Sequence, residues 1–85
     1  MMTSAQLRAA RALLGIDQRR LAELSGVSLP TIQRMEASEG TVRGVVSSLT
    51  KVVEALDEAG VELIGDDQPS SGRGRGVRLK QRTGA

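Results

Sequence analysis

The sequence predicts a mainly helical domain of four to five short helices that ends in a short two-stranded β-hairpin. Apolar residues recur at three- and four-residue spacing in successive stretches before residue 60, which is the helical period. Glycines and capping residues separate these stretches. After Gly60 the pattern changes to short β-prone segments around a Gly/Ser-rich stretch. With 85 residues, a single domain is expected.

The first helix is expected to start at Thr3, which fits a capping box with Gln6. Its apolar face consists of Leu7, Ala10 and Leu14. Gly15 should end this helix, and Asp17 is a good N-cap for the second. The apolar residues of the second helix are Leu21, Ala22 and Leu24.

The third helix follows after a single tight turn. Gly26 should stop the second helix in the left-handed conformation that glycine tolerates. Val27 then points inward, and Ser28 caps a helix with Pro30 in its first turn, where a missing N–H costs nothing. The inner face of this third helix is formed by Ile32 and Met35.

Residues 38–44 are expected to form a loop, and a longer helix should run from about Val45 to Ala59. Its apolar stripe is wider than a thin core layer needs, and consists of Val45, Val46, Leu49, Val52, Val53 and Leu56. Val61–Ile64 and residues 76–80 should pair as a hairpin, although a disordered tail after Ile64 is the alternative. We therefore divide the chain into a helical domain (1–60), a hairpin extension (61–80) and a disordered tail (81–85).

Composition excludes several classes of function. The chain has no aromatic residue, His or Cys, so base stacking on aromatic side chains and the usual metal and nucleophile sites are absent. We therefore expect that the protein is not an enzyme and that it binds no cofactor, metal or small-molecule ligand. No apolar run approaches the roughly 18 residues of a membrane span, and the first residues lack the apolar region of a signal peptide. A cytoplasmic protein is expected.

The net charge of +2 hides an uneven distribution: residues 1–53 carry +3, residues 54–67 carry −6 and residues 68–85 carry +5. Basic regions attract phosphate. The Arg/Gly segment 72–82 could therefore reach a DNA minor groove, or it could be only the exposed turn and tail of the hairpin.

Two short helices joined by a tight Gly-containing turn are typical of a helix-turn-helix, although an ordinary helical hairpin has the same outline. In the DNA-binding form, one helix enters a major groove about 12 Å wide while the other braces it. The more specific signal is the order of nine residues: Gln18, Leu21, Ala22, Gly26, Val27, Ser28, Thr31, Ile32 and Glu36.

This order resembles the Cro/lambda-repressor-like (XRE) helix-turn-helix family, over roughly residues 4–58. The final segments "ALDEAGVELI" and "GVRLK" are similar to a group of very small bacterial XRE regulators in which two short strands follow the helical domain. The resemblance implies a lambda-repressor-like fold and a sequence-specific regulator of double-stranded DNA.

The resemblance also implies roles for individual residues. The third helix would be the recognition helix, and its base-facing residues would be Leu29, Pro30, Gln33 and Arg34. Gln33 could bond adenine, and Arg34 could bond guanine or grip a phosphate, whereas the first two offer only apolar contact. The phosphate contacts would be Gln18, Arg19, Ser28, Thr31 and Arg43, with Arg8 and Arg20 as further candidates. Thr31 could instead pack, and Gln18 could also brace the start of the recognition helix.

The same resemblance implies a structural role for one pair of residues, Arg11 and Glu36. Arg11 lies seven residues before Gln18, at the position where relatives place an arginine that pairs with the glutamate closing the third helix. We therefore expect Arg11 and Glu36 to form a structural ion pair between the first and third helices.

Family members usually form homodimers on pseudo-palindromic sites. The candidate dimer surfaces are the fourth helix and the first strand, with the residues Val45, Leu49, Val52, Leu56, Val61 and Leu63. The alternative is that the apolar stripe serves the core of its own chain.

RNA polymerase or another regulator is a further candidate partner. An antitoxin or other partner-binding protein that uses this domain for autoregulation, and a non-specific architectural DNA-binding protein, are the competing functions.

Overall fold

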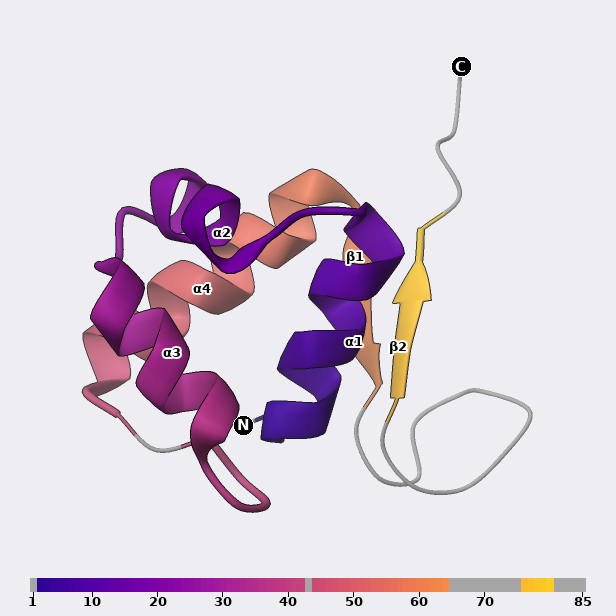
Figure 1. The fold of residues 1–85 in the computed structure, drawn as a ribbon. Coiled ribbons are helices and arrows are strands. Elements are labelled where there is room, and N and C mark those ends of the chain that lie inside the picture. Colours follow the sequence, from indigo (N-terminus) through magenta and orange to yellow (C-terminus); the bar gives the residue numbers. More distant parts are fainter. Residues whose placement is uncertain (1, 43, 65–75, 81–85) are drawn as a thin grey trace.

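The computed structural model describes residues 2–42, 44–64 and 76–80. Within these ranges the chain forms four helices and a two-stranded antiparallel sheet. The elements are α1 (Ser4–Leu14), α2 (Gln18–Ser25), α3 (Leu29–Ala37), α4 (Val46–Ala59), β1 (Val61–Ile64) and β2 (Gly76–Leu79). Figure 1 shows α2 and α3 on one side of the molecule and the two strands beside α1 on the other. The mainly helical prediction with a closing hairpin is confirmed.

Local sequence signals set the helix boundaries as expected. The Thr3 side chain accepts a hydrogen bond from the main-chain N–H of Gln6, and the Gln6 side chain accepts one from the main-chain N–H of Thr3. Asp17 Oδ1 accepts from the N–H of Arg20 at 2.7 Å. Gly15 and Gly26 end α1 and α2 with φ of 67° and 71°, a conformation that glycine adopts without strain.

The loop after α3 is tied to the start of the chain. The N–H of Ser4 donates to the carbonyl of Gly40 at 2.8 Å, and the N–H of Val42 donates to the carbonyl of Met2 at 2.9 Å. Thr3 and Thr41 thereby form an isolated antiparallel bridge. The sequence predicted only a loop here. The bridge anchors the C-terminal end of α3 to the N-terminal end of α1.

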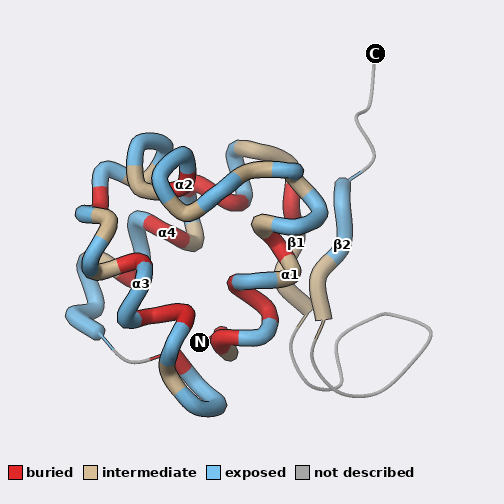
Figure 2. Tube along the Cα trace, in the orientation of Figure 1, coloured by how far each residue is buried: buried red, intermediate tan, exposed pale blue. Residues whose placement is uncertain are grey.

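The core is aliphatic and lies between the four helices and β1 (Figure 2). Its fully buried large side chains are Met2, Leu7, Leu21, Ile32, Met35, Leu56, Val52 and Val61. Of the apolar residues of α2, Leu21 is buried and Ala22 is half-buried, whereas Leu24 is exposed.

α4 begins one residue later than predicted, because Val45 occupies the N-cap position and makes no side-chain capping bond. Only part of its wide apolar stripe faces inward. Leu49, Val52 and Leu56 are buried, whereas Val45 and Val46 are 70% and 69% exposed.

The hairpin pairs Val61 with Leu79 and Ile64 with Gly76. It is docked on the helices by Val61, which is buried, and by Leu63 and Val77, which pack partly buried against the core. The alternative of a disordered tail directly after Ile64 is wrong for residues 76–79, which form β2. The predicted disordered tail at 81–85 lies outside the described residues.

Gln6 connects this hairpin to α1. Its side-chain Nε2 donates to the carbonyl of Ile64 at 3.0 Å and to the carbonyl of Gly76 at 2.9 Å. These two residues face each other at one end of the strand pair. A single buried amide therefore caps the start of α1 and also holds both strands.

Candidate nucleic-acid interface

The packing of α3 determines which of its side chains reach solvent. Ile32 and Met35 are buried, so the inner face of α3 is fixed against the core, and Val27 in the preceding turn is buried too. Pro30, Gln33, Arg34 and Ser28 are exposed, and Leu29 and Thr31 are half-buried. Of the four predicted base-facing residues, three are thus exposed, and Leu29 is half-buried.

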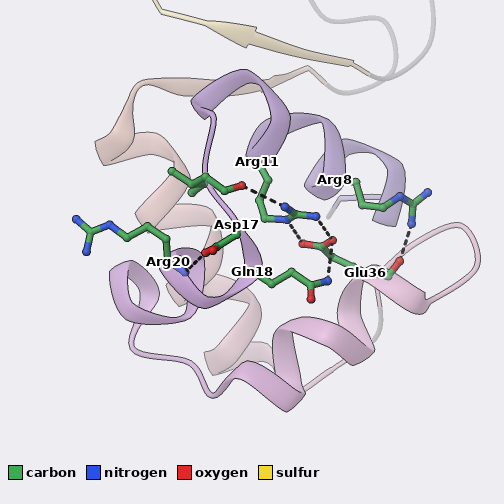
Figure 3. Close-up of polar contacts among 7 residues, drawn as sticks. Arg8, Arg11, Asp17, Gln18, Arg20 and Glu36 are labelled. Atoms are coloured by element: carbon green, nitrogen blue, oxygen red, sulfur yellow. Dashed lines mark hydrogen bonds and ion pairs between the residues drawn. The ribbon is translucent and has the colours of Figure 1, made fainter.

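A buried carboxylate fixes the far end of α3. Arg11 binds Glu36 with two hydrogen bonds, Nε to Oε2 at 2.6 Å and Nη2 to Oε1 at 2.8 Å. The side chain of Glu36 is only 4% exposed, against 22% for Arg11. Gln18 Nε2 adds a third hydrogen bond to Oε1 at 3.1 Å (Figure 3). The expected Arg11–Glu36 ion pair is therefore present, and Gln18 completes it.

The same junction extends to main-chain carbonyls. Arg11 Nη1 donates to the carbonyl of Ile16 in the α1–α2 turn at 3.1 Å. Arg8 Nη1 donates to the carbonyl of Glu36 at 2.5 Å, near the C-terminal end of α3, where a positive charge is favoured by the helix dipole. Arg8 is one of the further candidates for a DNA-backbone contact, and part of its guanidinium is engaged within the protein (Figure 3). Gln18 braces the end of α3, and not its start.

The pKa of Arg11 is raised above the usual arginine value, chiefly by the hydrogen bond to Glu36. Burial opposes this rise, and the negative charges of Glu36 and Asp17 add to it. A raised pKa in the folded state contributes stability that is fully present below the usual arginine pKa and is lost only as the pH rises through the higher folded value. The arginine of this junction therefore stays charged throughout the physiological range.

Hydroxyl groups link the start of α3 to its outer surface. Ser28 Oγ lies 2.9 Å from Thr31 Oγ1 and accepts from the N–H of Thr31 at 3.4 Å. Arg34 Nη2 donates to Thr31 Oγ1 at 3.1 Å. The sequence predicted the capping role of Ser28. It gave no signal for the contact between Thr31 and Arg34 beyond their three-residue spacing.

The other predicted basic contacts differ in their surroundings. Arg19 is exposed on α2, and Arg20 is paired with Glu23 at 3.1 Å on the same helix. Arg43 lies outside the described residues. The basic residues of segment 72–82 that the structure describes pair with acidic residues of the stretch 54–67. Arg78 pairs with Glu62 at 2.8 Å, and Lys80 pairs with Asp57. For residues 78 and 80, these two pairs favour the alternative in which the segment is the exposed turn and tail of the hairpin.

Most of the predicted dimer residues are not accessible. Leu49, Val52, Leu56 and Val61 are buried in the core of their own chain, which was the alternative for the wide stripe. A second copy could not contact them without opening that core. Of the six candidates, Val45 is exposed and Leu63 is half-buried.

Among residues 2–42, 44–64 and 76–80, no group of three or more Asp or Glu side chains is placed to hold a metal ion. In the same ranges, no helix has the length and apolar character needed to cross a membrane.

Residues 7–45 match a family model described as helix-turn-helix. The match spans most of α1, all of α2 and α3, and the loop that leads to α4. It contains both the buried Glu36 junction and the exposed surface of α3. No curated protein matches the chain.

Proposed function

Residues 7–45 are a Cro/C1-type helix-turn-helix domain of the XRE family, a family of DNA-binding regulators, and on this premise we propose that the protein is a sequence-specific regulator that inserts α3 into the major groove. The observation that carries the proposal is the division of α3 into a fixed inner face and an exposed outer face. A helix that reads base edges must be held rigidly while its polar side chains stay free of the core.

The outer face of α3 supplies two base-reading side chains. Gln33 can form two hydrogen bonds with adenine, and Arg34 can form two with guanine. Pro30 is exposed beside them, and Leu29 is half-buried. These two offer apolar contact to thymine methyl groups, so the first turn of α3 should discriminate less than the second.

Phosphate contacts are proposed for the flanks of α3. Ser28 lies at the N-terminus of α3, where N–H groups and the helix dipole favour an anion. Arg19 and Gln18 open α2, and Arg43 is proposed from the family resemblance alone. Thr31 adjoins Ser28 and supports this phosphate contact through the contact between their two hydroxyl groups.

We further propose a homodimer on a pseudo-palindromic operator with half-sites about 34 Å apart. With four of the six original candidates buried, the remaining apolar surface comprises Val45 and Val46 at the start of α4, and Leu63 and Leu79 on the hairpin. Two variants distinguish the two candidate dimer surfaces: one replaces both Val45 and Val46 by Ser, and the other replaces Leu79 by Ser. Sedimentation of each variant, free and with DNA, identifies the substitution that abolishes the dimer. A wild-type protein that is monomeric in both conditions would contradict this proposal.

The proposed function is tested by selecting bound duplexes from a random pool. The expected result is one enriched sequence, with two-fold symmetry if the protein binds as a dimer. Arg34→Ala and Gln33→Ala should each keep the helical circular dichroism spectrum and lower the preference for that sequence by about 1–3 kcal/mol.

Lys51→Ala is the matched control, because Lys51 is an exposed cation on α4. It should leave sequence preference unchanged. A pool from which no sequence is enriched, or folded Arg34 and Gln33 variants with unaltered preference, would refute α3 as a base-reading helix. A protein that binds every duplex equally would be the architectural alternative.

A further inference from the structure

The hydroxyl of Thr31 occupies a position between the cap of α3 and its outer surface. On one side it lies 2.9 Å from Ser28 Oγ, and on the other it accepts a hydrogen bond from Arg34 Nη2 at 3.1 Å. We propose that Thr31 is a positioning residue, which holds the guanidinium of Arg34 in place for base reading and turns the Ser28 hydroxyl proton outward toward a DNA phosphate. This inference rests on the proposed function of α3.

Hydrogen-bond accounting allows this arrangement, in which Thr31 is the donor to Ser28. A hydroxyl group has one proton and two acceptor lone pairs. Thr31 Oγ1 uses one lone pair for Arg34, and Ser28 Oγ uses one for the N–H of Thr31. When Thr31 donates its proton to Ser28, the second lone pair of Ser28 is also filled. The only remaining capacity of Ser28 is then its own proton, which suits a phosphate oxygen.

The contact also bears on the cost of ordering Arg34. An exposed arginine samples many rotamers, and binding a base fixes one of them at an entropic cost. Arg34 is exposed, whereas Thr31 is half-buried and β-branched, so its χ1 angle is restricted. A stiff residue thus restrains a flexible one three positions along the same helix, before DNA is bound.

The restraint is tested first on the free protein, by ¹⁵N relaxation of the arginine Nε groups. Arg34 should be more ordered than Arg19, which is likewise exposed but for which no hydroxyl contact occurs among the described residues. Thr31→Val removes the hydroxyl and keeps the shape, so Arg34 should become as mobile as Arg19. Thr31→Ser should restore the order. Equal mobility of Arg34 and Arg19 in the wild-type protein would overturn the proposal, whatever the protein does to DNA.

The effect on base reading is tested with the duplex that the wild-type protein selects. Each position of this duplex is replaced in turn by the other three bases, and the affinity for every variant is measured. Thr31→Val should lower the preference at the Arg34 base pair about fivefold, the size of one hydrogen bond, and leave the Gln33 base pair unaffected. Thr31→Ser should retain the wild-type preference. Unchanged preference in Thr31→Val, or an equal loss at every base pair, would overturn the proposal. If Arg34→Ala itself alters no base preference, the proposed base reading fails, while the relaxation result still decides the restraint.

Discussion

α1 carries two polar junctions, and they hold different parts of the molecule by different physical means. On one face, Arg11 and Arg8 bind Glu36 and fix α3. On another face, Gln6 binds the carbonyls of Ile64 and Gly76 and fixes the hairpin. The first junction is charged and contains a buried carboxylate, and the second is neutral and ends on main-chain carbonyls.

The difference determines how each part can detach. Removing either Arg11 or Glu36 leaves the other charge without its partner in a partly buried junction, which is costly enough to threaten a small domain. Breaking the neutral junction leaves two carbonyls that water can bind once the hairpin separates. We therefore expect α3 to be lost only with global unfolding and the hairpin to open locally at lower free energy.

The largest effect is expected for Glu36→Ala. Arg11 and Gln18 lose their partner, and the free energy of unfolding should fall by about 3 kcal/mol in denaturant titrations. Glu23→Ala is the control, since its pair with Arg20 is exposed, and it should change stability by about 0.5 kcal/mol or less. A loss in Glu36→Ala no larger than in Glu23→Ala would show that the charged junction is not dominant. Loss of DNA binding by Glu36→Ala would report unfolding and not a missing base contact.

The second effect in size is expected for Gln6→Glu. The substitution keeps the oxygen that caps α1 but replaces the amide nitrogen by an oxygen that faces two carbonyls. The hairpin should be destabilised by about 2 kcal/mol relative to the helices. Hydrogen exchange should lose protection at the N–H of Lys80, which binds the carbonyl of Gly60, and keep it at the N–H of Ile32 in α3.

Gln33→Glu is the matched control, because it makes the same change at an exposed position of α3. It should leave protection at Lys80 unaltered. If Gln6→Glu removes protection from α3 and the hairpin together, then the hairpin is not a separate unit and the contrast between the junctions is wrong.

The two junctions also differ in how far the sequence predicts them. Asp17, Ser28 and Gly26 act within a few residues, so their caps follow from local rules. The Arg11–Glu36 pair is 25 residues apart and was predicted because the family resemblance places both residues. Gln6 satisfies a local capping box completely, and nothing in that pattern signals a second bond to Gly76, 70 residues away.

Helix α4 shows a second limit. Helical spacing identifies an apolar stripe but not which part of it faces a neighbour. Val45 and Leu49 both belong to the stripe, yet Val45 is exposed and Leu49 is buried. The boundary depends on where α4 begins relative to the other helices, which is a property of the tertiary packing. The same packing brings Arg8 to the carbonyl of Glu36, a contact that the spacing of the sequence does not indicate.

A smaller effect is expected for Gln18→Ala, which removes one hydrogen bond from the charged junction. The free energy of unfolding should fall by about 1 kcal/mol. If Gln18 also bonds a phosphate, DNA affinity should fall with no change in its salt dependence, because a neutral side chain releases no counterion. Arg19→Ala should instead reduce the slope of log K against log salt by about one. A changed slope in Gln18→Ala would contradict this separation of roles.

The smallest effect is expected for Arg78→Gln on the hairpin surface. Arg78 and Glu62 are 49% and 43% exposed, so their ion pair should contribute about 0.5 kcal/mol and weaken as salt is added. Hydrogen exchange at Lys80 N–H should therefore accelerate only slightly, far less than in Gln6→Glu. Lys51→Gln, an equal change of charge on α4, serves as the control for DNA binding. If Arg78→Gln lowers DNA affinity more than this control while the hairpin stays docked, then Arg78 exchanges Glu62 for a phosphate. In that case the neutral junction at Gln6 positions a hairpin that binds DNA, and its role is not only structural.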